Sequence, residues 1–171
     1  MAVIIQKEWY LSRLAVIIQV TMKITHHSMI ISQQTHIPQL CLECARVNKV
    51  FFQNRLILSD HLSILSGPTN YPELAKRVNA QTILREPFQT LPNDSNDVLC
   101  HLSELIAQLA FGERVLDELG LAAHLSKNST SKEELWWMRD EHATYARRLF
   151  ELQRCYLHTL LAKTDGLKNE K

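Results

Sequence analysis

Glycine and proline are scarce in this chain, which has four glycines and five prolines among 171 residues. Their scarcity argues against a sheet protein, because these two residues make many of the tight turns that sheets need. The sequence also has no glycine-rich loop of the kind that holds a nucleotide phosphate. What remains is a chain in which helices can run for many residues without interruption.

The chain also lacks a strong net charge and a long uncharged run at its start. Its formal net charge is +1, so any binding to nucleic acid must come from a local basic patch. Within residues 1–23 the longest uncharged run is residues 14–22, whereas a membrane-spanning helix needs about 20 apolar residues. We therefore expect a cytoplasmic protein with no membrane contact, whose residues 1–35 form a helix or an arm.

Patterns that bind metals are incomplete. Cys41 and Cys44 form one CxxC pair, but neither His36 nor His101 completes the spacing of a zinc finger. Di-iron helical bundles use a Glu-x-x-His spacing, and no glutamate in this chain has a histidine three residues later. We expect no metal and no other cofactor, and the cysteines suit small apolar positions on helices in a reducing compartment.

Apolar residues recur at alternating spacings of three and four, which is the pattern of amphipathic helices. Three sets show it: Leu40, Cys44, Val47, Phe51, Leu58, Leu62 and Leu65; Val98, Leu102, Leu105, Leu109, Leu116 and Leu119; and Leu135, Met138, His142, Tyr145, Leu149, Leu152, Tyr156 and Leu160. Pro38 suits the first turn of the first helix, and Gly120 suits the end of the second. Ser131, followed by Glu134, resembles a capping box for the third. We expect an all-α protein, an antiparallel helical bundle of three long helices plus shorter helical segments, one of them at residues 71–84.

One stretch, DEHATYARR at residues 140–148, concentrates chemically active side chains. His142 falls on the apolar stripe, where a histidine is typically a hydrogen-bonded core residue. Tyr145 and Arg148 are three residues apart and therefore adjacent on the helix surface. A ring beside a guanidinium suits a carboxylate attached to an aromatic group. The alternative, which spacing alone favours, is that the two arginines pair with nearby acids such as Glu151.

Three stretches, in this order, resemble the family of the bacterial primosomal replication protein PriC (primosomal protein N″). They are CARVNKVFFQNR at residues 44–55, LSELIAQLAFGE at 102–113 and HATYARRLFELQRCYLHTLLAKTD at 142–165. Residues 36–171 thus resemble the family's helical bundle, whereas residues 1–35 match it poorly. Family members continue after the final Thr-Asp with another charged helix that completes a binding pocket, so we expect a member shortened at its C-terminus.

The resemblance implies a DNA replication restart adaptor rather than an enzyme. Proteins of this family recognise abandoned forks coated with single-stranded DNA-binding protein and promote reloading of the replicative helicase DnaB. They dock on the acidic C-terminal tail of the single-stranded DNA-binding protein, which ends in a phenylalanine carboxylate. On this chain the docking pocket would contain Arg148 and Tyr145, with Arg147 beside them. The expected state is a monomer.

Basic and aromatic residues also recur on the first of the predicted helices. Arg46, Lys49 and Arg55 lie at spacings of three and six, and Phe52 lies among them. Such a group predicts weak, salt-sensitive binding to single-stranded or forked DNA. From the resemblance to the PriC family we also expect Arg46 and Phe52 to contact the helicase. Two other functions stay open: a generic helical interaction module without a working tail pocket, and a helical-bundle metalloenzyme.

Overall fold

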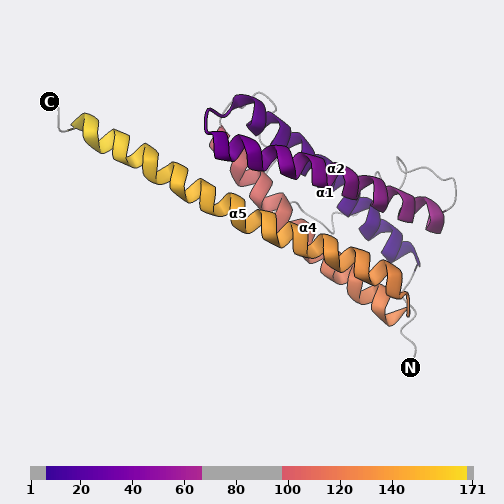
Figure 1. Cartoon of the computed structure of the whole chain (residues 1–171). Coiled ribbons are helices and arrows are strands. Elements are labelled where there is room, and N and C mark those ends of the chain that lie inside the picture. The colour runs from indigo at the N-terminus through magenta and orange to yellow at the C-terminus, as the bar shows by residue number, and fades with distance from the viewer. Residues whose placement is uncertain (1–6, 67–97, 169–171) are drawn as a thin grey trace.

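Four long helices make up the described part of the chain, which in this computed structural model is residues 7–66 and 98–168. They are α1 (Lys7–Gln34), α2 (Pro38–Ser66), α4 (Val98–Leu125) and α5 (Ser129–Lys168) (Figure 1). The prediction of an all-α bundle is confirmed. There is one more long helix than expected, because residues 7–34 are helical throughout rather than an arm. The shorter segment expected at residues 71–84 lies outside the described residues.

The helices form a ring in which neighbouring helices run antiparallel. α1 packs closely against both α2 and α4, and α4 packs closely against α5, whereas α2 and α5 close the ring along a looser seam. On this seam Asn54 contacts Glu141 and Glu43 contacts Arg148. Residue numbers therefore rise along α2 as they fall along α5.

The core follows the apolar stripes that the sequence shows. The buried members of the three stripes are Leu40, Cys44, Val47, Phe51, Leu58, Leu62, Leu102, Leu105, Leu109, Leu116, Leu119, Leu135, Met138, His142 and Leu149. The stripes open to solvent at their far ends, where Leu65 and Leu160 are more than a third exposed. Four other members are partly exposed: Val98, Tyr145, Leu152 and Tyr156. α1 adds a segment, residues 14–18, in which every side chain is buried. Five consecutive residues point to all sides of a helix, so α1 has no polar face over this stretch.

α1 is also long and apolar enough, by length and composition, to cross a membrane. However, 56% of its most apolar 18-residue window is buried inside the bundle, and its Arg13 forms a 3.3 Å ion pair with Glu118 of α4. Packing of this kind is what a core helix needs. We therefore describe α1 as a bundle helix, and the absence of membrane contact stays a prediction.

Two helix boundaries differ from the sequence-based predictions. α4 does not end at Gly120 but continues to Leu125, where the chain turns through Lys127 at a φ of 58°. Ser131 does not cap α5. The cap is Asn128, whose side-chain oxygen accepts a hydrogen bond from the backbone N–H of Ser131 at 3.2 Å. Asparagine is among the best N-cap residues, and here it directly follows the left-handed residue Lys127.

Two glycines inside α4 allow α5 to approach closely. A Cβ atom added to Gly120 would collide with the indole of Trp136. A Cβ atom added to Gly112 would lie 2.5 Å from Cδ2 of His142, closer than real Cβ atoms come to other atoms. The glycine that the sequence suggested as a helix end is therefore a packing residue, and the helix runs on past it.

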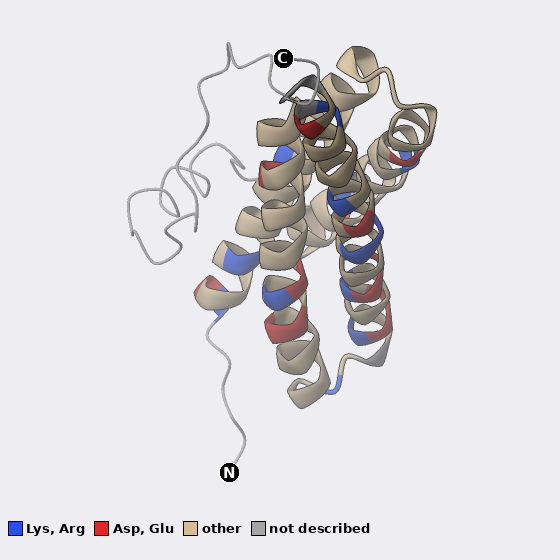
Figure 2. Cartoon of the chain, turned by 90° about the vertical axis from the view of Figure 1, so that its left-hand side faces the viewer, with Lys and Arg blue, Asp and Glu red and all other residues tan. Residues whose placement is uncertain are grey.

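α5 is the longest helix, and most of its charged side chains are exposed to solvent. Its 40 residues span about 60 Å, whereas the 28 or 29 residues of the others span about 42 Å. Its C-terminal part consequently continues beyond the other helices (Figure 1). Basic and acidic residues follow one another along it (Figure 2), which gives the bundle charged groups of both signs on this side.

Candidate functional site

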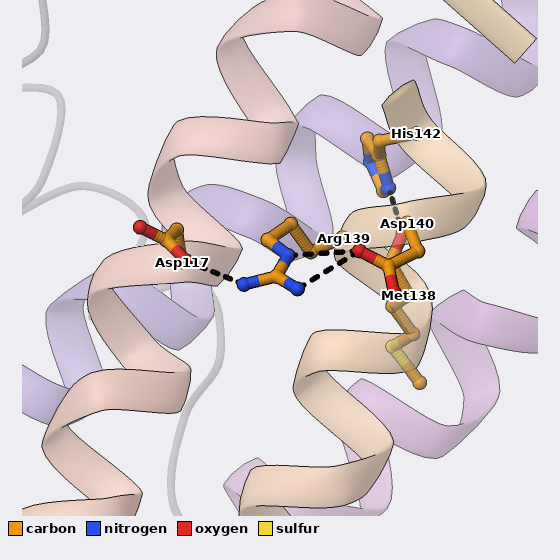
Figure 3. Close-up of polar contacts among 5 residues, drawn as sticks. All are labelled: Asp117, Met138, Arg139, Asp140 and His142. Carbon is orange, nitrogen blue, oxygen red and sulfur yellow. Dashed lines mark hydrogen bonds and ion pairs between the residues drawn. The ribbon is translucent and has the colours of Figure 1, made fainter. Parts of the chain in front are cut away.

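The acidic start of the stretch DEHATYARR takes part in structural ion pairs. Arg139 reaches across to Asp117 of α4 at 2.7 Å and also contacts its neighbour Asp140 at 2.9 Å (Figure 3). The hydrogen bond from Arg139 to Asp117 raises the pKa of the guanidinium. Asp140 therefore helps to orient the arginine that holds α5 against α4.

His142 is a core residue, as its place on the apolar stripe predicted. Its side chain is fully buried, and its Nδ1 donates a hydrogen bond to the carbonyl oxygen of Met138 at 2.8 Å (Figure 3). The ring of Phe51 meets it edge-on at 4.6 Å, and its Nε2 is buried without a hydrogen-bond partner. Across residues 7–66 and 98–168, no group of three or more His, Cys, Asp or Glu residues is placed to hold a metal ion.

The burial of His142 predicts a loss of stability in mild acid. Desolvation lowers the pKa of His142 from 6.5 to about 4, so between these values the unfolded chain binds a proton that the folded chain does not. The free energy of unfolding should therefore fall as the pH falls from 6.5 to 4, by up to about 1.4 kcal/mol per pH unit from this residue. Half-buried His27, whose pKa is also lowered to about 4, acts in the same direction.

Urea unfolding at pH 7, 6 and 5 measures this dependence, and His142→Leu is the informative variant because leucine fills a similar volume and does not titrate. The free energy of unfolding should depend less steeply on pH in His142→Leu than in the wild type, while the contribution of His27 remains. Identical slopes in the two proteins would show that His142 does not titrate in this way.

Arg148, at the end of the stretch, meets α2 across the looser seam. Nη1 of Arg148 lies 3.4 Å from Oε1 of Glu43, and Nη1 of Arg46 lies 3.4 Å from Oε2 of the same carboxylate. The guanidinium carbon of Arg148 lies 5.7 Å from the centre of the Tyr145 ring. We call these four residues, Glu43, Arg46, Tyr145 and Arg148, the arginine–tyrosine site.

Within the arginine–tyrosine site the carboxylate is covered and the arginines are open. Glu43 is 8% exposed, whereas the side chains of Arg46 and Arg148 are 56% and 55% exposed. The ring of Tyr145 packs edge-on against Phe51 at 5.8 Å. Burial raises the pKa of Tyr145, and the charge of Glu43 acts in the same direction, so the hydroxyl stays neutral. Two cationic groups and a neutral ring thus face solvent together.

The sequence assigned Arg46 and Arg148 to different sites, and the structure brings them together through Glu43. The acid that pairs with Arg148 is on another helix, 105 residues away. It is not Glu151, which pairs with Arg154 at 3.4 Å. Sequence reasoning missed Glu43. The sequence shows that Glu43 lies three residues before Arg46, but it does not show that α5 packs beside this part of α2.

The other predicted contact residues lie outside the arginine–tyrosine site. Lys49 and Phe52 are exposed on α2, and the guanidinium carbon of Arg55 lies 4.9 Å from the centre of the Phe52 ring. Arg147 is exposed on α5 and is not one of the groups that contact Glu43. The structure therefore shows a cation–aromatic face on α2 and leaves Arg147 beside the site rather than in it.

Beside the ring contacts of Phe51, the α2–α5 seam carries two further polar pairs. Asn54, the polar exception in the first apolar stripe, is 3% exposed and donates a 2.7 Å hydrogen bond to Oε2 of Glu141. Burial raises the pKa of Glu141, and this hydrogen bond lowers it in part. Farther along, Nε2 of His61 lies 2.6 Å from Oε2 of Glu134. A seam closed by polar pairs fits the looser packing of α2 against α5.

Fold and site together define a class: an antiparallel helical bundle with an arginine–tyrosine site where two of its helices meet. Comparisons of the chain with protein-family models, with curated proteins and with solved structures found no match. The resemblance to the PriC family therefore rests on the three sequence stretches alone.

Proposed function

We propose that this chain is a DNA replication restart adaptor that docks on the acidic C-terminal tail of single-stranded DNA-binding protein. The observation that supports this proposal is that Arg46 and Arg148 already share a carboxylate, that of Glu43, beside the ring of Tyr145. Arginine forms charge-assisted hydrogen bonds with carboxylates. A C-terminal phenylalanine offers a carboxylate for the arginines and a ring for the tyrosine.

The two arginines of the site come from two helices. Arg148 lies on α5, where the resemblance expects the docking arginine, and Arg46 lies on α2. An anion bound between them would contact both sides of the α2–α5 seam. No catalytic group is needed for this activity, which is why we propose an adaptor and not an enzyme.

A binding experiment with a single peptide in two forms tests the proposal. The peptide carries a fluorophore at its N-terminus and ends in Asp-Asp-Ile-Pro-Phe, either with a free carboxylate or with an amide. The free acid should bind, and the amide should bind about tenfold more weakly, because it lacks the charge that the arginines pair with. Equal binding of the two forms would exclude docking of the terminal carboxylate.

We also propose that Lys49, Phe52 and Arg55 contact single-stranded DNA at forks. Arg55 already stacks beside Phe52, and exposed rings and cations suit bases and phosphates. With two or three phosphate contacts, affinity should be micromolar or weaker and should fall roughly tenfold between about 50 and 200 mM salt. Titration of a labelled single strand measures both.

Two variants separate the parts of this DNA contact. Lys49→Ala should reduce the salt dependence, because one phosphate contact is lost. Phe52→Ala should weaken binding without changing the salt dependence, because stacking releases no counterions. Tight binding that salt does not affect would argue against the contact. The resemblance also places the contact with the helicase at Arg46 and Phe52, and this assignment stays a prediction.

A further inference from the structure

Glu43 occupies the position at which the proposed peptide carboxylate would bind. Each of its oxygens lies 3.4 Å from one arginine. Charge-assisted pairs of this type are typically 2.7–2.9 Å long, so both contacts are loose. The arginines are more than half exposed and can turn toward a ligand. Glu43, at 8% exposed and within α2, cannot move far from them.

We propose that Glu43 is an internal competitor in the arginine–tyrosine site, so that an incoming carboxylate must displace it from Arg148. This inference rests on the proposed function. After displacement, Glu43 stays close to the bound ligand as a like charge. It therefore lowers the affinity for every anion, and it disfavours doubly charged groups more than single carboxylates. The ligand class that follows is a singly charged carboxylate joined to an aromatic group.

A structural role for Glu43 predicts the opposite effect. If Glu43 served mainly to hold the two arginines in the correct positions, its removal would weaken binding. The long contacts and the exposure of both guanidinium groups argue against such a role, because neither arginine is held tightly. The sign of the change in affinity therefore distinguishes a competitor from a positioning residue.

The experiment compares Glu43→Gln with wild type, using the fluorescent peptide with a free carboxylate. Glutamine keeps the shape of the side chain and an acceptor oxygen but removes the charge. The expected result is about fivefold tighter binding, because the arginines for which Glu43 competes are more than half exposed and charge interactions there are weak. Glu151→Gln is the matched control, because it removes the same charge from an exposed pair with Arg154 and should change the affinity little.

Adding Arg148→Ala to each protein tests the route of the effect. The gain from Glu43→Gln should be clearly smaller in the Arg148→Ala background, since the competition for that guanidinium is gone and only the like charge and the pair with Arg46 remain. Thermal unfolding of every variant shows whether it is folded. If Glu43→Gln is unfolded, Glu43→Met, which has a similar length and no charge, takes its place and must give the same sign.

The outcomes separate this inference from the proposed function. If wild type binds the peptide and Glu43→Gln binds equally or more weakly, Glu43 is not a competitor, and the proposed docking stands. If neither protein binds, both ideas fail. If only Glu43→Gln binds, or if it binds more tightly in an Arg148-dependent way, the competitor role is supported.

Discussion

Replacing Gly112 with alanine should destabilise the bundle by about 2–3 kcal/mol, even though alanine is the better helix former by about 1 kcal/mol. The added Cβ atom would lie 2.5 Å from Cδ2 of His142, 2.6 Å from its Nε2 and 3.2 Å from Cδ1 of Ile17. His142 cannot turn away, because it is fully buried and hydrogen-bonded to Met138. Either α4 and α5 must separate, or the histidine must lose its bond.

Gly166→Ala is the matched control for this substitution. Gly166 lies within α5, and a Cβ atom added there meets nothing within 4 Å. This variant should therefore be as stable as wild type, or more stable by up to about 1 kcal/mol. Urea unfolding followed by circular dichroism measures both proteins. If the two alanine variants were equally stable, the close contact at Gly112 would not exist in solution.

Arg148→Ala should weaken binding of the tail peptide about 10- to 100-fold. A hydrogen bond to a charged group contributes about 1.5–3 kcal/mol, and about 1.4 kcal/mol corresponds to a factor of ten. The substitution should cost little stability, because the Arg148 side chain is 55% exposed and alanine favours the helix. Fluorescence anisotropy with the labelled peptide gives the affinity.

Arg147→Ala provides the control within the same helix. Arg147 is the adjacent residue, about 100° around the helix from Arg148, and it does not contact Glu43. Its loss removes the same charge and should change the affinity much less. Tyr145→Ala would be a poorer test, since Tyr145 packs against the buried ring of Phe51. The proposed function is excluded if a folded Arg148→Ala protein binds as wild type does, or if Arg147→Ala is the more damaging change.

Much of the fold could be predicted from the sequence, because the buried positions of a helix recur every three or four residues and are mostly apolar. The three apolar stripes and the start of α2 at Pro38 are present as expected. α1 was harder to predict, because a helix buried on many sides has no clear polar face and resembles a membrane or arm segment. Gly120 misled for a related reason: a glycine can end a helix or admit a neighbouring helix, and only the position of Trp136 decides between them.

The candidate site was predictable only in part. Tyr145 and Arg148 are three residues apart on one helix, so their proximity follows from helical geometry alone. Glu43 and Arg46 lie beside Tyr145 and Arg148 because α2 packs against this part of α5. No spacing along the chain predicts this contact between two helices. The pairing of Asn54 with Glu141 was hidden in the same way. Contacts between distant helices depend on how the whole bundle packs.

The way the four helices pack has a consequence for how the arginine–tyrosine site forms during folding. α1 with α2, and α4 with α5, are helical hairpins joined by only three residues each, 35–37 and 126–128, so each can form early from contacts that are near in the chain. The arginine–tyrosine site has one half on each hairpin. It therefore exists only after the hairpins have docked, chiefly through α1 and α4. Substitutions at that distant interface can abolish recognition while leaving every residue of the site unchanged.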